Sequence, residues 1–220
     1  MSTYIIIFAR MKIKRAKNFT NFFNASHTKT QVYLHHTAGG ADGQAQFSFW
    51  QADATPIATC VCISRDGTID QGYGSQYWAY HLGLGVKHFK AHELPYINLD
   101  KASIGVEICN WGWLTKKGDK YYTYVGKELP AERVIALDKP YKGHTYWEAY
   151  TEAQIASVRE LLVHWQKRYG IPVEYNEGDM WGVSHNAMTN VPGVYTHNSV
   201  RADKTDIYPH PGLIAMLKSL

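Results

Sequence analysis

Two histidines and one aspartate, far apart along the chain, have the side chains that a catalytic metal needs. His35 lies near the end of the apolar segment 31–37, and His197 and Asp206 lie nine residues apart on one irregular segment. Two neutral imidazole nitrogens and a carboxylate can bind catalytic zinc and leave a fourth position for water. The pattern therefore predicts a zinc centre if the fold brings the three together. Taken alone, His35 could instead be a partly buried histidine bonded to a backbone carbonyl.

Two charged residues are suited to act on a substrate beside such a metal. Glu107 is the only acid in the otherwise apolar segment Ser103–Cys109, where burial would raise its pKa toward the range of a general base. Lys204 precedes Asp206 by two residues, and its ammonium could stabilise a developing oxyanion there. We expect both residues to be catalytic. An ion pair between Glu107 and a nearby Lys or Arg is the alternative.

The elements that must position these side chains follow from hydrophobic periodicity and turn residues. Strands are predicted over 31–37, 57–64, 68–71 and 103–109, with the middle two joined as a hairpin by the turn at 65–67. Helices are predicted over 41–54, 151–169 and 213–220. Strands that alternate with helices, together with one hairpin, predict an α/β fold: a single domain with a central mixed β-sheet flanked by helices.

Three parts of the chain do not follow this alternation. Residues 1–30 are interpreted as an N-terminal extension with at most one strand, at Ile5–Phe8, so that the domain spans 31–220. Residues 111–147, called the insertion below, are expected to be a surface insertion that carries its own hairpin around the turn at 116–119. Residues 177–205 form a long irregular segment, and loops of this length in a compact domain are usually functional.

The composition excludes several classes of protein. With 220 residues, 45% of them apolar and 19% charged, the chain is neither disordered nor fibrous. A net charge of +4 is far from the strongly basic character of nucleic-acid-binding proteins. The apolar run Tyr4–Ala9 is too short to cross a membrane or to form the core of a signal peptide. Cys60 and Cys62 share one strand face and cannot bond to each other, which fits synthesis in a reducing cytosol.

Five sequence blocks occur in an order that points to one family of hydrolases. They are Leu34–Gly39 (LHHTAG), Ser64–Ile69 (SRDGTI), Trp78–Gly83 (WAYHLG), Ser103–Glu107 (SIGVE) and the loop from His197 to Asp206. In this order they resemble the zinc-dependent N-acetylmuramoyl-L-alanine amidases, a family shared by phage lysozyme-type endolysins and peptidoglycan recognition proteins. The resemblance covers Gln31 to the C-terminus, and its specificity comes from the five blocks together.

The resemblance implies roles for individual residues. His35, His197 and Asp206 match the three ligands of Zn²⁺, Lys204 matches the lysine that stabilises the tetrahedral intermediate, and Glu107 matches the acidic catalytic residue.

Three more residues are candidates for contact with the substrate. His81 falls where the family often has a histidine that lines the substrate groove. Trp78 lies in the same block as His81, and Trp111 begins the insertion. Simple packing is the alternative for Trp111.

The chain departs from the family pattern at two positions. Thr59 stands where some members have a catalytic tyrosine, and threonine has no acid–base capacity near neutral pH, so the role should fall on Glu107. His185 competes with His197 for the metal. The spacing of nine residues to Asp206 is close to that of the family and favours His197.

The function implied by the resemblance is hydrolysis of the amide bond between N-acetylmuramic acid and L-alanine in peptidoglycan. We expect a monomeric phage endolysin with Zn²⁺ as cofactor and peptidoglycan as partner, without a nucleic-acid partner and without membrane insertion. It would be made in the host cytoplasm and would act on the wall after release. The alternatives are a non-catalytic peptidoglycan-binding module, a cytosolic amidase that recycles muropeptides, and a zinc peptidase that cleaves a different amide.

Overall fold

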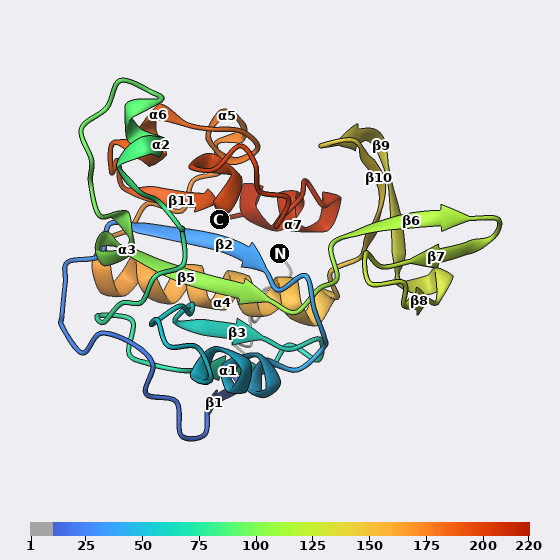
Figure 1. The fold of residues 1–220 in the computed structure, drawn as a ribbon, viewed down its shortest axis with the longest axis horizontal. Coiled ribbons are helices and arrows are strands. Elements are labelled where there is room, and N and C mark those ends of the chain that lie inside the picture. The colour runs from blue at the N-terminus through green and yellow to red at the C-terminus, as the bar shows by residue number, and fades with distance from the viewer. Residues whose placement is uncertain (1–10) are drawn as a thin grey trace, which may run out of the picture.

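Six strands form a mixed sheet at the centre of the protein, seen in a computed structural model that describes residues 11–220 (Figure 1). Their order is β1-β4-β3-β5-β2-β11. Strands β3, β5, β2 and β11 run parallel to one another, β4 runs antiparallel to β3, and β1 runs parallel to β4. The sheet and its helices confirm the predicted α/β class. The strands are β1 (Ile13–Arg15), β2 (Gln31–His36), β3 (Val61–Ile63), β4 (Ile69–Gln71), β5 (Ser103–Ile108) and β11 (Gly193–Thr196).

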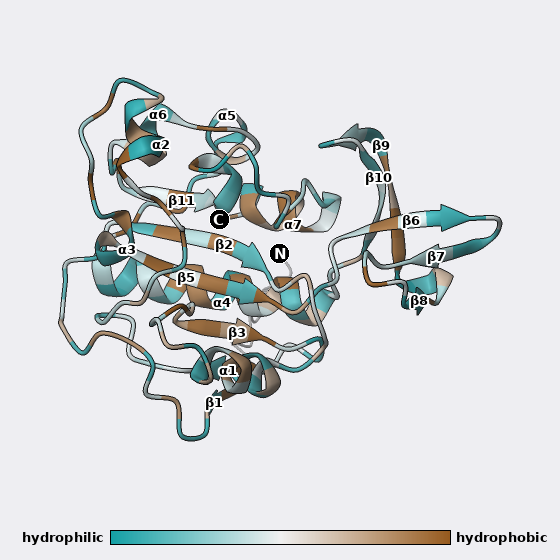
Figure 2. Cartoon of the chain, in the orientation of Figure 1, coloured by the Kyte–Doolittle hydropathy of each residue, from teal (hydrophilic) through white to brown (hydrophobic). Residues whose placement is uncertain are grey.

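The neighbouring interior strands β2 and β5 are buried along their whole length. Parallel strands that are covered on both faces need continuous apolar runs, and Figure 2 shows β3 and β5 as largely hydrophobic. Polar side chains appear near the carboxyl ends, where His35 of β2 is in register with Glu107 of β5. Ligands bind at this edge of α/β sheets, so the fold brings its buried polar groups to the expected place.

Helices cover the sheet, and the longest of them is the one that the sequence predicts most clearly. Helix α4 (Glu152–Tyr169) crosses the sheet and buries Val158, Leu162 and Trp165 (Figure 1). Thr151 begins it with a capping box, and Gly170 ends it at a φ of 69°. The other helices are α1 (Gly43–Gln51), α2 (Val86–Lys90), α3 (Leu99–Ala102), α5 (Glu177–Met180), α6 (His185–Met188) and α7 (Pro211–Lys218), with short 3₁₀ turns η1 (Ala131–Arg133) and η2 (His197–Ser199).

The insertion folds into a second, five-stranded antiparallel sheet that projects from the rest of the protein (Figure 1). The predicted hairpin is present as β6 and β7, with Gly118 in the turn at a φ of 58°. The other three strands were not predicted, because β8 has only two residues and β9 is mostly exposed without alternation. The strands are β6 (Trp113–Lys117), β7 (Lys120–Tyr122), β8 (Glu128–Leu129), β9 (Val134–Tyr141) and β10 (His144–Glu148).

A buried carboxylate fastens the insertion to the domain. Glu148 is fully buried at the end of β10, where it forms an ion pair with the Arg65 guanidinium at 3.0 Å and accepts a hydrogen bond from the backbone N–H of Trp111 at 2.6 Å. The Arg133 guanidinium also contacts this carboxylate. A buried charge with these partners is satisfied, whereas removing one partner would leave it unpaired.

Two segments at the sheet edges differ from the sequence expectations. Residues 11–30 lie along the sheet, with β1 paired to β4 and Phe19 packed edge-on against Phe47 at 4.9 Å between ring centroids. The strand expected at Ile5–Phe8 lies outside the described residues. At the opposite edge, β11 occupies part of the segment predicted to be irregular, because four residues between loops are too few to give a periodic pattern.

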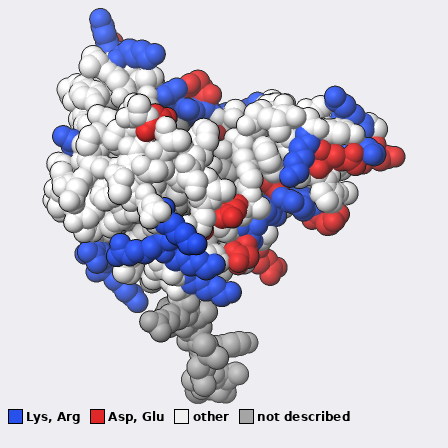
Figure 3. Space-filling view, turned by 60° about the horizontal axis from the view of Figure 1, so that its bottom comes forward, with Lys and Arg blue, Asp and Glu red and all other residues white. Residues whose placement is uncertain are grey.

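Charged groups are unevenly distributed over the surface. Figure 3 shows Lys and Arg side chains gathered next to the grey segment, and Lys12, Lys14 and Lys17 are exposed in this part of the chain. On the insertion, basic and acidic side chains alternate (Figure 3). None of the helices within residues 11–220 combines the length and the apolar character that crossing a membrane requires.

Candidate metal centre

His35, His197 and Asp206 meet in a cleft at the carboxyl ends of the central strands. His35 Nδ1 lies 3.1 Å from His197 Nδ1 and 3.1 Å from Asp206 Oδ2, and His197 Nδ1 lies 2.9 Å from the same oxygen. The cleft has a volume of about 350 Å³ and is also lined by Glu107 and Lys204. In the described part of the chain, these are the three His, Cys, Asp or Glu side chains with ligand atoms grouped closely enough, within 4.8 Å, to hold one metal ion.

A directional chain of hydrogen bonds orients the His35 ring. The Ser103 hydroxyl donates to the carbonyl of Leu99 at 2.7 Å, so its oxygen accepts from His81 Nε2 at 2.9 Å. His81 Nδ1 must then be an acceptor, and the group that donates to it is His35 Nε2, 3.1 Å away. His35 Nδ1 is therefore left with a free lone pair that points into the cleft.

The His197 ring is oriented by the backbone. Its Nε2 lies 3.0 Å from the carbonyl oxygen of Leu82, which can only accept, so the proton of the neutral ring is on Nε2 and Nδ1 has the lone pair. Two lone pairs and the Asp206 oxygen thus face one another without a proton between them. This arrangement is unfavourable unless a cation lies among them, and the donor set of two imidazoles and a carboxylate fits zinc.

The protonation states of the cluster suit a cation. The pKa of His35 is lowered to about 4, chiefly by burial and also by the neighbouring His197, while Asp206 opposes the change. Burial disfavours the charge on Asp206, but the contacts with His197 and His35 outweigh this effect and hold the pKa of the carboxyl well below its ordinary value. Near neutral pH, His35 is therefore neutral and Asp206 ionised, the forms in which they bind metals.

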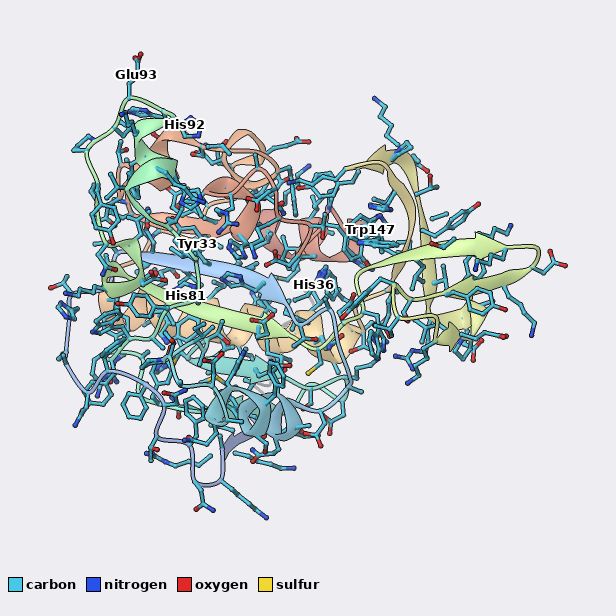
Figure 4. The ribbon with its side chains drawn as sticks, viewed as in Figure 1. Tyr33, His36, His81, His92, Glu93 and Trp147 are labelled. Carbon is cyan, nitrogen blue, oxygen red and sulfur yellow. The ribbon has the colours of Figure 1, made fainter. Side chains whose placement is uncertain are left out.

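The backbone after Asp206 is held in a conformation that its sequence disfavours. Ile207 has a φ of 64°, which β-branched residues rarely adopt. The Ile207 N–H donates to Nδ1 of His36 at 2.9 Å, and Asn198 Nδ2 donates to the carbonyls of Asp206 and Ile207 at 2.9 and 3.0 Å. Figure 4 shows His36 at the end of β2. These bonds keep the Asp206 carboxylate in the cleft, and stored strain of this kind is typical of functional sites.

Glu107 faces the same cleft from the strand beside His35. Within residues 11–220, no hydrogen bond to its carboxyl group is present, and Lys204, its nearest counter-charge, lines the cleft from the opposite loop. Burial raises the pKa of Glu107 well above its ordinary value, Asp206 raises it further, and Lys204 partly opposes this. The ion-pair alternative for Glu107 is therefore not favoured, and a carboxyl with a raised pKa can exchange protons near neutral pH.

The insertion contacts the loop that carries Lys204. Lys142, in the turn between β9 and β10, donates from Nζ to the carbonyls of Ala202, at 2.7 Å, and Lys204. The adjacent Tyr141 hydroxyl donates to the carbonyl of Trp181 at 3.2 Å. The second sheet thereby fixes one wall of the cleft.

Three residues named from the sequence lie outside the lining of the cleft. Trp78 is buried and stacks on Phe23 at 4.0 Å between ring centroids, so the structure does not bring it to the substrate. Trp111 is half-buried at the base of the insertion, below the Lys127 ammonium. His185 is exposed at the start of α6 and is not part of the cluster, so the alternative ligand assignment is not supported.

Other polar residues near the cluster were predicted only in part. His81 lines the cleft as expected, but its ring lies between His35 and Ser103. The roles of Ser103, Asn198 and His36 were missed. Ser103 and His36 could have been found from the sequence, because a polar residue inside a fully buried strand needs a buried hydrogen-bond partner.

The cysteines and Thr59 make their polar contacts away from the metal cluster. Cys60 and Cys62 are buried and free, and Cys62 Sγ lies 3.6 Å from Sγ of Cys109. The Thr59 hydroxyl borders the cleft but donates to the carbonyl of Val61 at 2.9 Å. Neither it nor the thiols contact the cluster.

Solved structures with a similar fold include an endolysin. The structure of PlyL has a TM-score of 0.51 and 14% identity over 96% of this chain and 96% of that one. A mutant endolysin from Bacillus subtilis has a TM-score of 0.50 and 15% identity over 89% and 90%. At these identities the likeness is one of fold, and no curated protein matches the sequence. The family model described as N-acetylmuramoyl-L-alanine amidase matches residues 26–211, and the chain therefore belongs to this family.

Proposed function

We propose that the protein is a zinc-dependent amidase that hydrolyses the bond between N-acetylmuramic acid and L-alanine in peptidoglycan. The single observation that carries the zinc assignment is the convergence of His35 Nδ1, His197 Nδ1 and Asp206 Oδ2 within 3.1 Å, with the other nitrogen of each ring committed as a donor. Family membership supports the amide bond as the target. All three ligand positions carry competent ligands, which favours an enzyme over a binding module.

In this proposal the ligand and catalytic residues of the cleft each have their own role in the hydrolysis. His35, His197 and Asp206 hold the zinc, which supplies Lewis-acid polarisation of the amide carbonyl and makes a water more acidic. Glu107 accepts the proton of the attacking water and later passes a proton to the leaving amine of L-alanine, a role that its raised pKa suits. The Lys204 ammonium faces the cleft and stabilises the negative charge that develops on the carbonyl oxygen.

Two histidine variants test the metal assignment with a matched control. His197→Ala removes a ligand and should abolish both stoichiometric zinc binding and wall release. His185→Ala removes an exposed histidine from the neighbouring segment and should change neither. Zinc content of the purified proteins and mass analysis of the released muropeptides are the measurements. Full zinc content in His197→Ala would refute the ligand set, whereas cleavage at a different amide would refute the substrate bond.

We further propose a role as a phage endolysin that is made in the host cytoplasm and reaches the wall after release. Support comes from the fold that the chain shares with an endolysin from Bacillus subtilis. Turnover on intact sacculi that greatly exceeds turnover on soluble muropeptides would agree with this role. The opposite preference would indicate a muropeptide-recycling amidase.

A further inference from the structure

Tyr124, in the turn between β7 and β8, joins the insertion to the rim of the metal cleft. Its hydroxyl donates to the carbonyl of Ala38 at 3.0 Å, and Ala38 lines the cleft. The side chain is nevertheless largely in solvent, since Tyr124 is 54% exposed. The ring is thus fixed at its tip by this hydrogen bond while much of the residue stays exposed.

Two further side chains extend this exposed ring into a platform. The Trp111 ring lies 6.3 Å from the Tyr124 ring, centroid to centroid, and the Lys127 ammonium lies 5.5 Å from the Trp111 ring. The Trp111 backbone is anchored by the fully buried Glu148 carboxylate. Tyr124, Trp111 and Lys127, called the platform below, therefore form a rigid aromatic surface with one cation.

The platform offers ring faces and few free polar groups. The Tyr124 hydroxyl is bonded to Ala38, and the Trp111 backbone N–H is bonded to Glu148. Peptide recognition needs free donors and acceptors for the peptide backbone. Exposed ring faces instead suit the C–H faces of pyranose sugars, while a lysine at the edge can hydrogen-bond their hydroxyl, acetamido or carboxylate oxygens.

We propose that the platform is a saccharide subsite that binds the glycan strand beyond the muramoyl residue at the cleft. This rests on the proposed function, which places a muramoyl residue in the cleft. The platform is joined through Tyr124 to Ala38, which lines the cleft, so a polymer seated at the metal would reach it. In this proposal the insertion provides a glycan-binding surface beside the catalytic cleft.

The test uses peptide-free glycan strands as the probe, because they lack the amide bond between the muramoyl group and L-alanine and can be measured whether or not the protein is an amidase. Tyr124→Ala should weaken their binding about threefold to tenfold, the effect of one lost ring contact. Tyr124→Phe keeps the ring and loses only the bond to Ala38, so its affinity should stay within about twofold. Tyr96→Ala removes an equally exposed tyrosine, 47% exposed, from another loop and should bind as the parent does.

A second readout uses the reaction on intact sacculi. Tyr124→Ala should raise KM more than it lowers kcat, because the subsite holds the strand and does not contact the reacting atoms. Unchanged glycan affinity in Tyr124→Ala, or no glycan binding by the parent protein, would overturn the proposal. An equal loss in Tyr124→Phe would also overturn it, because Tyr124 would then only hold the Ala38 loop. Binding of free stem peptides in place of glycan would assign the platform to the peptide.

Discussion

The two sheets of this protein are built from different kinds of contact. In the central sheet, β2 and β5 are fully buried, and His35 is oriented by a hydrogen-bond chain that ends on a backbone carbonyl. In the insertion sheet, many side chains are half-exposed and pair as rings with lysines, as Lys116 does with Tyr121 at 5.7 Å and Tyr146 at 5.6 Å. Each such contact contributes only about 0.5–1 kcal/mol at an exposed site. The proposed chemistry thus lies in the fully buried sheet, and the insertion supplies more exposed contacts around it.

The two regions meet at both walls of the cleft. The insertion reaches one wall through Tyr124 and Ala38, and the other through Lys142 and the carbonyls of Ala202 and Lys204. If the central sheet carries the catalytic groups and the insertion only supports them, substitutions in the central sheet should change activity by orders of magnitude. Substitutions in the insertion should change it by small factors.

The largest effect is expected for Glu107→Gln, in the central sheet. The amide is similar in size to the carboxyl but cannot accept the proton of the attacking water, so turnover should fall about a thousandfold. Zinc content should stay at one ion per chain, because Glu107 is outside the ligand cluster. The measurements are initial rates on sacculi and metal analysis of the same sample. A variant with more than a tenth of the parent rate would show that another group is the base.

The second largest effect should come from Ser103→Ala, which breaks the hydrogen-bond chain to His35. Without the hydroxyl, His81 can change tautomer and present a proton toward His35 Nε2. Loss of such a supporting bond typically weakens metal affinity by roughly 10- to 100-fold. Competition with a zinc chelator measures the affinity, and the absorption spectrum of the cobalt form reports the ligand geometry.

The matched control is Ser157→Ala, which also removes a buried hydroxyl that donates to a carbonyl, here that of Gly67 at 2.6 Å, on helix α4. This variant should lose stability and keep its zinc affinity. Equal zinc affinities for the two variants would mean that the chain through Ser103 does not orient His35.

The difference between the two sheets explains which parts of the fold and of the site could be predicted from the sequence. The burial of β2 and β5 leaves apolar segments and that of α4 an apolar stripe, whereas His35, His197 and Asp206 were identified from their ligand chemistry, their spacing and the resemblance to the amidases. Which nitrogen of each ring is free could not be predicted, because this depends on carbonyls of distant segments.

Most of the insertion sheet was missed for a different reason. Its strands are stabilised by pairing with one another and by ring contacts, so β8 to β10 carry no periodic pattern. Trp78 was assigned to the substrate from its position beside His81 in one sequence block, whereas Phe23, fifty-five residues earlier, buries it. Contacts between segments so far apart are not visible in local sequence.

A smaller effect is expected for Lys142→Met, in the insertion. The thioether keeps the length of the side chain but loses both hydrogen bonds to the loop of Lys204, so kcat should fall about tenfold or less through looser placement of that ammonium. Lys139→Met, at an exposed position in the preceding strand β9, is the control and should leave kcat unchanged. A thousandfold loss of kcat in Lys142→Met would contradict the expectation that substitutions in the insertion have small effects.

The smallest effect concerns the pH dependence of stability. The pKa of Glu107 is raised in the folded protein, chiefly by burial, so the folded state binds this proton more tightly than the unfolded state does. The stability that the group contributes is present below its ordinary pKa of 4.5 and is lost as pH rises through the folded value. The amide introduced by Glu107→Gln has no proton that titrates in this pH range. The free energy of unfolding of this variant, relative to the parent, should therefore increase with pH above 4.5 when both are measured by denaturant in chelator. A constant difference would mean that the cleft does not desolvate Glu107, and its assignment as the base would lose its physical reason.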